Sequence, residues 1–201
     1  GDLLPNSDVD LLVLLDDAPL SEAQRLKINT AVEGWLGSLW DMGLAPSHSV
    51  RTVAECLAFC HEDLASETAV LEARFLAGDE DLFQRFSQQF FANFDLQAFW
   101  RNKVAEMRAR YSRFEETPFS LEPNCKESPG GLRDLHLMLW LSKAAHLAQS
   151  WEDLHDIGWL NQKQARLIVR CETLLLAIRA HLHILTRRPE NRLLFDLQTS
   201  L

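Results

Sequence analysis

The spacing of apolar and polar positions predicts strands and helices in the first half of the chain. Val9 to Leu15 is apolar except at Asp10, which is typical of a strand buried on both faces. A polar turn then leads into a predicted amphipathic helix over residues 21–41, with Ser21 as its N-cap and Gly43 just beyond its end. Residues 47–52 alternate and predict a second short strand, with His48 on one face and Ser49 on the other. Three more helices are expected in this half, over residues 53–60, 63–72 and 80–91.

The second half carries apolar residues at steps of three and four, which predicts helices throughout. One such stripe runs from Trp100 to Phe114 and another from Leu167 to Leu185. Two further helices are expected over residues 132–148 and 151–155. Striped helices pack against one another, so the fold class we expect is α+β: a small mixed sheet with helices, followed by an all-α helical bundle.

Charge divides the chain at about the same place as the elements do. Residues 1–95 carry 17 acidic and 5 basic side chains, whereas residues 96–201 carry 12 and 15. We therefore expect two domains, 1–95 and 96–201. An acidic first half argues against general binding of nucleic acid, and no apolar run approaches the ~20 residues of a membrane helix. With no secretory signal in the sequence, the expected location is the cytoplasm.

Asp8 and Asp10 are the first candidates for chemistry. Alternate side chains of a strand share a face, so the two carboxylates should point the same way. Carboxylates held that close repel each other unless a cation lies between them, and Mg²⁺ is typically bound by one or two carboxylates together with substrate phosphates. The alternative is an ordinary polar turn, in which Asp and Ser are common. The spacing of the neighbouring Gly1, Pro5 and Ser7 favours the metal-binding interpretation.

Phosphate contacts are expected from basic residues and from a glycine turn. The guanidinium forks of Arg74 and Arg51 suit phosphate oxygens, although each could instead pair with one of the many carboxylates. Gly130 and Gly131 precede a predicted helix and follow Lys126. Backbone N–H groups there could close over a triphosphate, or the turn could serve only as the entry to the helix. The sequence leaves both alternatives open.

Five blocks in order resemble the family of bacterial PII uridylyltransferase/uridylyl-removing enzymes, which belong to the polymerase β-like nucleotidyltransferases. The blocks are GDLLPNSDVDLL (1–12), HSVRT (48–52), LEARFLAGD (71–79), SPGGLRDLH (128–136) and NRLLFD (191–196). They extend over nearly the whole chain. A similar Gly-Gly-x-Arg-Asp/Glu block occurs in the related glutamine synthetase adenylyltransferases.

The resemblance implies an enzyme of nitrogen regulation that moves UMP from UTP to a tyrosine hydroxyl of the PII signal protein. It implies Asp8 and Asp10 as catalytic ligands of Mg²⁺ or Mn²⁺. Ser7, Arg74, Lys126, Gly130 and Gly131 are the expected nucleotide-binding residues. The resemblance also implies a hydrolase that removes UMP. The His155-Asp156 dipeptide is not assigned to that activity, because a His-Asp hydrolase site needs further distant ligands.

Two departures from the family pattern leave alternatives open. The superfamily often takes a third carboxylate from a neighbouring strand, but residues 48–52 contain no acid, so His48, Ser49 or Glu72 could take that place. The superfamily's first strand and glycine turn are expected upstream of Gly1. The resemblance therefore implies that residues 1–95 are a truncated polymerase β-like nucleotidyltransferase core lacking its first strand, and we expect this chain alone to have little or no activity. The alternative functions are an adenylyltransferase of the type that modifies glutamine synthetase, or a non-catalytic nucleotide-sensing or docking module.

Overall fold

The computed structural model describes residues 3–200, which form two compact units. Residues up to Asp63 and Arg74–Asn93 make the first unit, and Leu64–Ala73 and Phe94 onward make the second. The expected division at residue 95 differs from these units at residues 64–73, which pack with the second unit. None of the described helices is long and apolar enough to cross a membrane.

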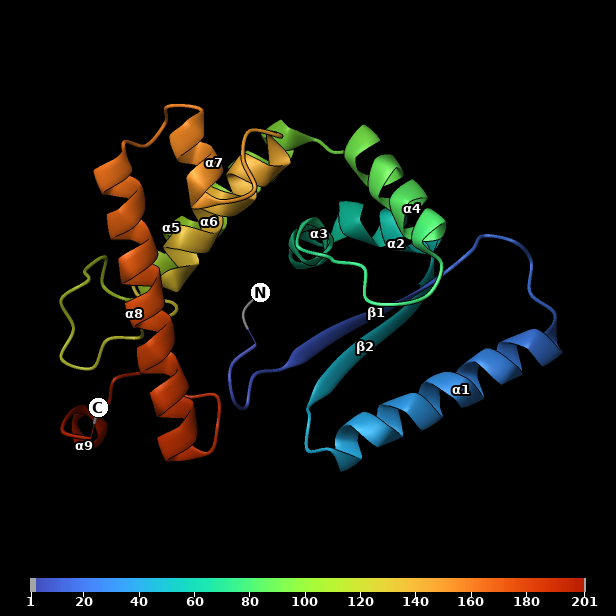
Figure 1. Ribbon diagram of the computed structural model, residues 1–201, viewed down its shortest axis with the longest axis horizontal. Coiled ribbons are helices and arrows are strands. Elements are labelled where there is room, and N and C mark those ends of the chain that lie inside the picture. Colours follow the sequence, from blue (N-terminus) through green and yellow to red (C-terminus); the bar gives the residue numbers. More distant parts are fainter. Residues whose placement is uncertain (1–2, 201) are drawn as a thin grey trace. The chain divides into compact units, whose positions relative to one another are not determined.

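The first unit is built on two parallel strands joined by a helix. Strand β1 (Val9–Leu15) pairs with β2 (Pro46–Thr52) in a register that sets Val9 opposite Pro46 and Leu15 opposite Thr52, and the two strands lie side by side in Figure 1. Between them runs α1 (Glu22–Asp41), which Ser21 opens with a capping box to Gln24, as its place at the N-terminus predicts. Gly43 follows with φ +79°, the left-handed conformation that suits glycine.

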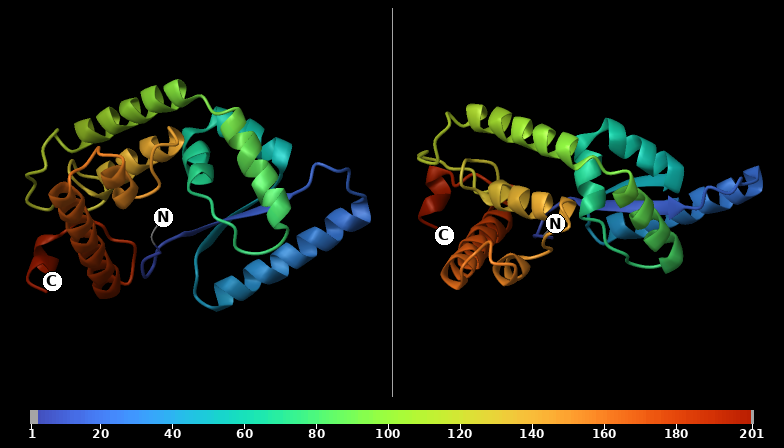
Figure 2. Two further views of the ribbon diagram at one scale, coloured as in Figure 1. Left: turned by 45° about the horizontal axis from the view of Figure 1, so that its top comes forward. Right: turned by 90° about the horizontal axis from the view of Figure 1, so that it is seen from above.

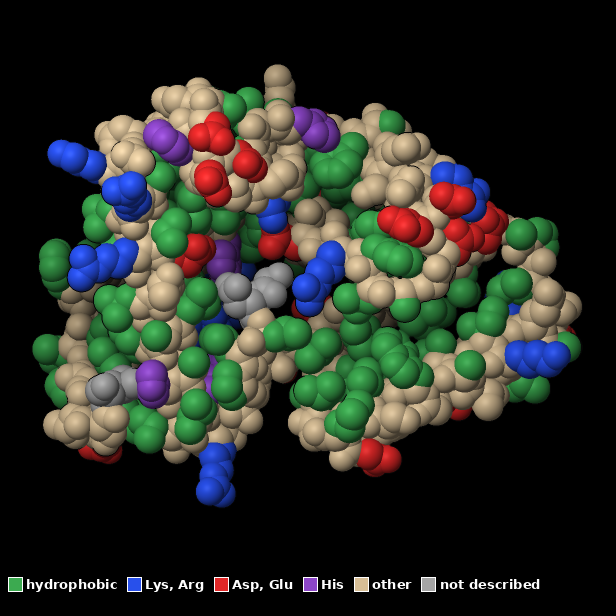
Figure 3. Space-filling model, in the orientation of Figure 1, with side chains coloured by type: hydrophobic (Ala, Val, Ile, Leu, Met, Phe, Trp, Pro, Cys, Tyr) green, Lys and Arg blue, Asp and Glu red, His purple; other side chains and the backbone are tan. Residues whose placement is uncertain are grey.

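The strand prediction for β1 is confirmed, but its burial on both faces is wrong. No residue of β1 is buried, and Leu12 is 37% exposed. In the described part of the chain, β1 has β2 as its one partner strand. Figure 3 shows hydrophobic side chains gathered on the surface around the sheet and α1, and the exposed ones on α1 include Leu26, Trp35 and Trp40.

The core of the first unit lies between α2 (Val53–Glu62) and α4 (Glu80–Ala92). Thr52 caps α2 with a capping box to Glu55, and Asp79 caps α4. Both helices match their predicted ranges closely. The buried side chains of these two helices are Val53, Cys56, Cys60, Phe86 and Phe90.

The second unit is helical, as the sequence predicts. Its helices are α3 (Leu64–Leu71), α5 (Leu96–Arg113), α6 (Leu132–Ala144), α7 (Trp151–Asp156), α8 (Gln162–Thr186) and α9 (Phe195–Gln198). Figure 2 shows α5 running alongside α6 in both views. Helix α6 ends at Ala144, four residues earlier than expected, because His146 adopts φ +53° and closes the helix.

The buried faces of α5 and α8 differ from the predicted stripes. On α5 the buried residues are Phe99, Lys103 and Arg110, whereas Trp100 is 53% exposed. On α8 only Arg179, Leu182 and His183 are buried, and Leu167 is 60% exposed. Hydrophobic spacing located both helices correctly. On α5 the stripe is confirmed in part, since Val104, Met107, Tyr111 and Phe114 are half-buried. On α8 most of the stripe is exposed, and charged side chains take part in the buried faces of both helices.

Candidate functional site

A tight turn leads into the acidic pair. The Ser7 N–H donates to the Leu4 carbonyl at 3.0 Å, and the Ser7 hydroxyl accepts from the Leu4 N–H at 3.2 Å. Asn6 has φ +61°, which this turn requires at its third position. The turn fixes Ser7 immediately before Asp8, and its hydroxyl keeps its own proton for donation to another group. Gly1 of the first sequence block lies outside the described residues.

Asp8 and Asp10 lie on an exposed face at the start of β1. Exposure alternates along this stretch: both aspartates are exposed, and Val9 and Leu11 are half-buried. This alternation is the pattern expected for two side chains on one face of a strand. Paired carboxylates open to solvent are hard oxygen donors with room for waters and phosphates, so they fit Mg²⁺ or Mn²⁺.

The neighbouring strand places a serine beside the acidic pair. Ser47 lies opposite Asp10 in the parallel register, and its hydroxyl donates to Asp10 Oδ1 at 2.6 Å. Ser47 is not among the site residues that the sequence predicts. The alternation Ser47-His48-Ser49 could have indicated it, but the register that selects Ser47 as the partner of Asp10 is not visible in the sequence.

The residues considered for the third metal ligand lie on the other face of the sheet or have partners other than Asp10. His48 falls on the opposite face of β2, and Ser49 accepts a hydrogen bond from Arg51. Glu72 belongs to the second unit, where its carboxylate pairs with Lys143. Within residues 3–200, no group of three His, Cys, Asp or Glu side chains could hold a metal ion together.

The two candidate arginines of the first unit differ in their surroundings. Arg51 Nε donates to Ser49 at 2.8 Å, and its guanidinium carbon stacks 3.9 Å from the centre of the Phe59 ring. Arg51 therefore joins β2 to α2, and pairing with a carboxylate is not what holds it. Arg74 is exposed in the stretch that follows α3, and the described residues give it no hydrogen bond or ion pair.

The glycine turn before α6 has its N–H groups occupied. Gly130, at φ +80°, donates to Asp134 Oδ2 at 2.7 Å, and Gly131 donates to the Ser128 carbonyl at 2.8 Å. The next two N–H groups bond to the carbonyls of Cys125 and Lys126. This pattern favours the helix-entry alternative for the turn, because the same N–H groups would be needed to hold a phosphate.

Close packing gives Gly131 a separate reason to be glycine. A Cβ atom at this position would lie 2.9–3.0 Å from three backbone carbonyl oxygens, those of Ser128, Cys125 and Lys126. Backbone atoms cannot rotate out of the way as a flexible side chain can. The turn is therefore a rigid support for the start of α6.

A buried charged cluster, which the sequence pattern does not predict, joins this turn to α5. Asp134 accepts from Arg110, from the Tyr111 hydroxyl at 2.7 Å and from the Gly130 N–H. Arg110 is only 3% exposed and also donates to the Glu127 carbonyl at 2.7 Å. Burial, and next the bond to the Asp134 carboxylate, raise the pKa of Tyr111. The phenol therefore stays protonated and continues to donate.

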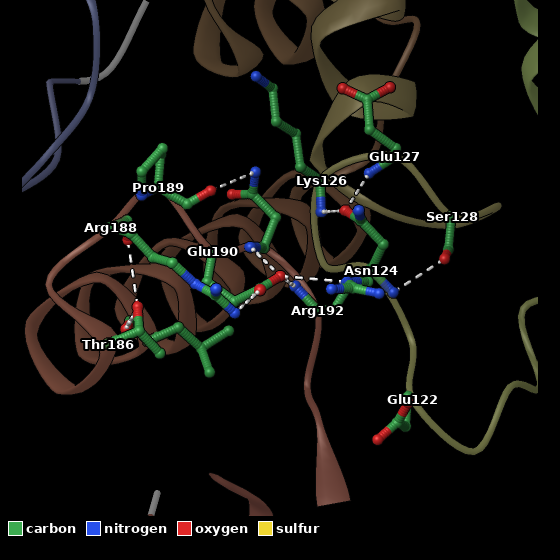
Figure 4. A network of polar contacts seen from close by, with 12 residues as sticks. Glu122, Asn124, Lys126, Glu127, Ser128, Thr186, Arg188, Pro189, Glu190 and Arg192 are labelled. Carbon is green, nitrogen blue, oxygen red and sulfur yellow. Dashed lines mark hydrogen bonds and ion pairs between the residues drawn. The ribbon is translucent and has the colours of Figure 1, made fainter.

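A second buried network ties the chain near Lys126 to the C-terminal segment (Figure 4). Glu190, 8% exposed, accepts from the side chains of Arg188 and Arg192 and from the Arg192 N–H. An antiparallel bridge pairs Asn124 with Arg192. Figure 4 shows the Lys126 side chain extending away from Glu190, while the Lys126 N–H bonds to Asn124.

Two further polar features of the second unit are a small hollow and the His155 side chain. A small hollow lined by Lys103, Arg110 and Trp140 holds about 10 Å³, roughly the room for one water. It is far too small for a nucleotide. The His155 ring Nδ1 lies 3.0 Å from the Leu160 carbonyl, so this histidine closes the turn after α7.

A matching family model and several similar proteins point to the same family. Residues 98–201 match the family model described as GlnD PII-uridylyltransferase. Across all 201 residues the chain is 47% identical to the bifunctional uridylyltransferase/uridylyl-removing enzyme of Bordetella avium and 45% identical to that of Cupriavidus pinatubonensis. The corresponding enzyme of Burkholderia pseudomallei is 45% identical over 199 residues, 99% of the chain. No solved structure matches.

The chain spans 23% of the length of each of these relatives. The family model covers more than half of the chain, and the relatives match it from end to end. The chain therefore belongs to the family of bifunctional uridylyltransferase/uridylyl-removing enzymes.

Proposed function

We propose that this chain supplies the polymerase β-like nucleotidyltransferase core of an enzyme that transfers UMP from UTP to a tyrosine hydroxyl of the PII signal protein. The observation that carries the proposal is the exposed pair Asp8 and Asp10 at the start of an edge strand, in a chain related from end to end to uridylyltransferases. PII comes from the family name, and the cytoplasm is the proposed location.

The transfer forms a bond between the tyrosyl oxygen and the α-phosphorus of UTP. The bond from that phosphorus to pyrophosphate breaks, and the phenolic proton passes to solvent. Asp8 and Asp10 would hold Mg²⁺ or Mn²⁺, which supplies charge neutralisation of the phosphates and a lowered pKa for the attacking hydroxyl. Ser7, with its remaining hydroxyl proton, would donate to a phosphate oxygen, and the exposed guanidinium of Arg74 in the same unit would contact the phosphates.

Gly130 and Gly131 have a different proposed role from Lys126. Internal hydrogen bonds hold the glycine turn, so we assign the two glycines to supporting α6. Lys126 remains the proposed phosphate-binding residue of this turn, because its ammonium group is carried on a rigid backbone.

Nucleotide-dependent thermal stabilisation of the 201-residue chain tests the proposal. A ligand that binds the folded chain at 100 times its Kd stabilises it by about 2.7 kcal/mol. UTP with Mg²⁺ should raise the melting temperature more than ATP with Mg²⁺, and Asp8→Asn should remove the increase. Asp41→Asn is the matched control, since Asp41 is also an exposed aspartate of the first unit.

The same titration separates the alternatives. A larger increase with ATP than with UTP would support an adenylyltransferase. An increase with UTP that survives Asp8→Asn would support a nucleotide-sensing module. No increase with either nucleotide would contradict nucleotide binding by this chain.

A further inference from the structure

We propose that Ser47 is a positioning residue that holds the Asp10 carboxylate in the orientation in which it binds the metal. This inference rests on the proposed function, because it assigns Asp10 to a divalent cation. It adds a residue that neither the sequence pattern nor the family resemblance assigns.

The contact itself is short and comes from the neighbouring strand. Ser47 Oγ lies 2.6 Å from Asp10 Oδ1, within the 2.5–2.7 Å range of hydroxyl hydrogen bonds to a carboxylate. The parallel register places the two residues opposite each other, so their side chains leave the same face of the sheet. The backbone pairing of β1 and β2 therefore fixes where the hydroxyl stands.

The contact has no evident role in packing. Both Ser47 and Asp10 are exposed, and a hydrogen bond between exposed groups contributes little to folding because water can replace either partner. What it does fix is the rotation of the carboxylate. Two oxygens offer about four acceptor positions, and Ser47 occupies one on Oδ1, which leaves Oδ2 open for a cation.

Ser47, the residue of the neighbouring strand that contacts Asp10, carries a hydroxyl and no charge. A hydroxyl there gives the site two negative charges and one fixed orientation, instead of three mutually repelling carboxylates. Residues that orient a metal ligand typically change metal affinity by about 10–100-fold when removed.

The test is a titration of the 201-residue chain with Mn²⁺, followed by electron paramagnetic resonance of the unbound ion. Ser47→Ala should raise the Kd for Mn²⁺ by about 10-fold, while Ser47→Thr, which keeps the hydroxyl, should restore the wild-type value. Ser49→Ala is the matched control: it removes a hydroxyl from the same face, two residues further along, whose bond is to Arg51. This control should leave the Kd unchanged.

The outcomes separate this inference from the function on which it rests. If the chain binds Mn²⁺ and Asp10→Asn weakens binding, but Ser47→Ala binds as the wild type does, Ser47 has no positioning role and the metal site stands. Equal losses in Ser47→Ala and Ser49→Ala would also overturn the inference, since they would indicate a general disturbance of β2. If the wild-type chain binds no Mn²⁺, the metal site and the role of Ser47 both fail. Circular dichroism of each variant verifies that the chain is folded.

Discussion

Replacement of Asp134 by Ala should destabilise the chain far more than its partly exposed position suggests. Its carboxylate is 20% exposed, but it is the carboxylate closest to the Arg110 side chain, which is only 4% exposed. Removing it leaves a buried guanidinium whose nearest remaining carboxylate oxygen, on Glu127, is 4.0 Å from Arg110 Nε. The bonds from Tyr111 and Gly130 are lost as well.

The magnitude follows from the cost of an unpaired buried charge. Breaking a buried ion pair by removing one partner costs about 3–5 kcal/mol, and we expect about 3 kcal/mol here because the Glu127 carbonyl still accepts from Arg110. Tyr111→Phe removes a single hydrogen bond to a charged acceptor and should cost about 1.5 kcal/mol.

Urea unfolding followed by circular dichroism and tryptophan fluorescence measures both values. With a slope of about 1–3 kcal/mol per molar urea, the Asp134→Ala midpoint should fall by at least about 1 M. The matched control is the double variant Arg110→Met with Asp134→Leu, which removes both charges and should cost less than Asp134→Ala alone. A loss under about 1 kcal/mol for Asp134→Ala, or a larger loss for the double variant, would refute the account of a buried charge held by its partner.

Three further predictions concern the turn, a buried acid and a surface thiol. Gly131→Ala should lower the free energy of unfolding, measured in urea, by about 1–3 kcal/mol, because its Cβ meets fixed carbonyls. Gly34→Ala, at a position within α1 where the Cβ has open space, should raise it by about 0.5–1 kcal/mol. The reverse order would contradict the packing. Burial raises the pKa of Glu190, but the Arg192 N–H and the Arg192 and Arg188 side chains outweigh it and hold the pKa below the usual 4.5. A lowered pKa stabilises the folded state at pH values above the unfolded-state pKa. The wild type should therefore have a larger free energy of unfolding than Glu190→Gln above about pH 4.5, and this difference should disappear as the pH falls through the folded-state pKa. A difference that grows in acid would be contrary evidence. Cys171 is exposed, so an aromatic disulfide reagent should modify it first in the native chain, and Cys171→Ser should remove the rapid phase; a rapid phase that persists would place a reactive thiol elsewhere.

Elements set by local rules could be predicted from the sequence. Helix α1 was located by its capping serine, its apolar spacing and the glycine after its end, and each acts within a few residues of the chain. Strands β1 and β2 are also predicted from local patterns, and their ranges agree with the prediction almost residue for residue.

Features set by distant partners could not be predicted in this way. The spacing on α5 predicts that Trp100 is buried, but Trp100 is exposed and the charged residues Lys103 and Arg110 are buried beside Phe99. A buried arginine is stable only if a carboxylate meets it, and Asp134 lies 24 positions away along the chain. For the same reason Ser47 was missed, since its relation to Asp10, 37 positions earlier, depends on the register of a parallel pair.

Transfer of labelled UMP to PII directly tests the proposed catalytic role of Asp8 and Asp10. The enzyme to use is that of Bordetella avium in which this chain replaces the 201-residue segment that it matches. We expect this enzyme to label PII from radioactive UTP. Asp8→Asn and Asp10→Asn should each reduce the rate by about 100-fold or more, because each removes a proposed direct metal ligand. Asp41→Asn should leave the rate unchanged. Labelling by Asp8→Asn or Asp10→Asn at the unsubstituted rate would contradict the claim.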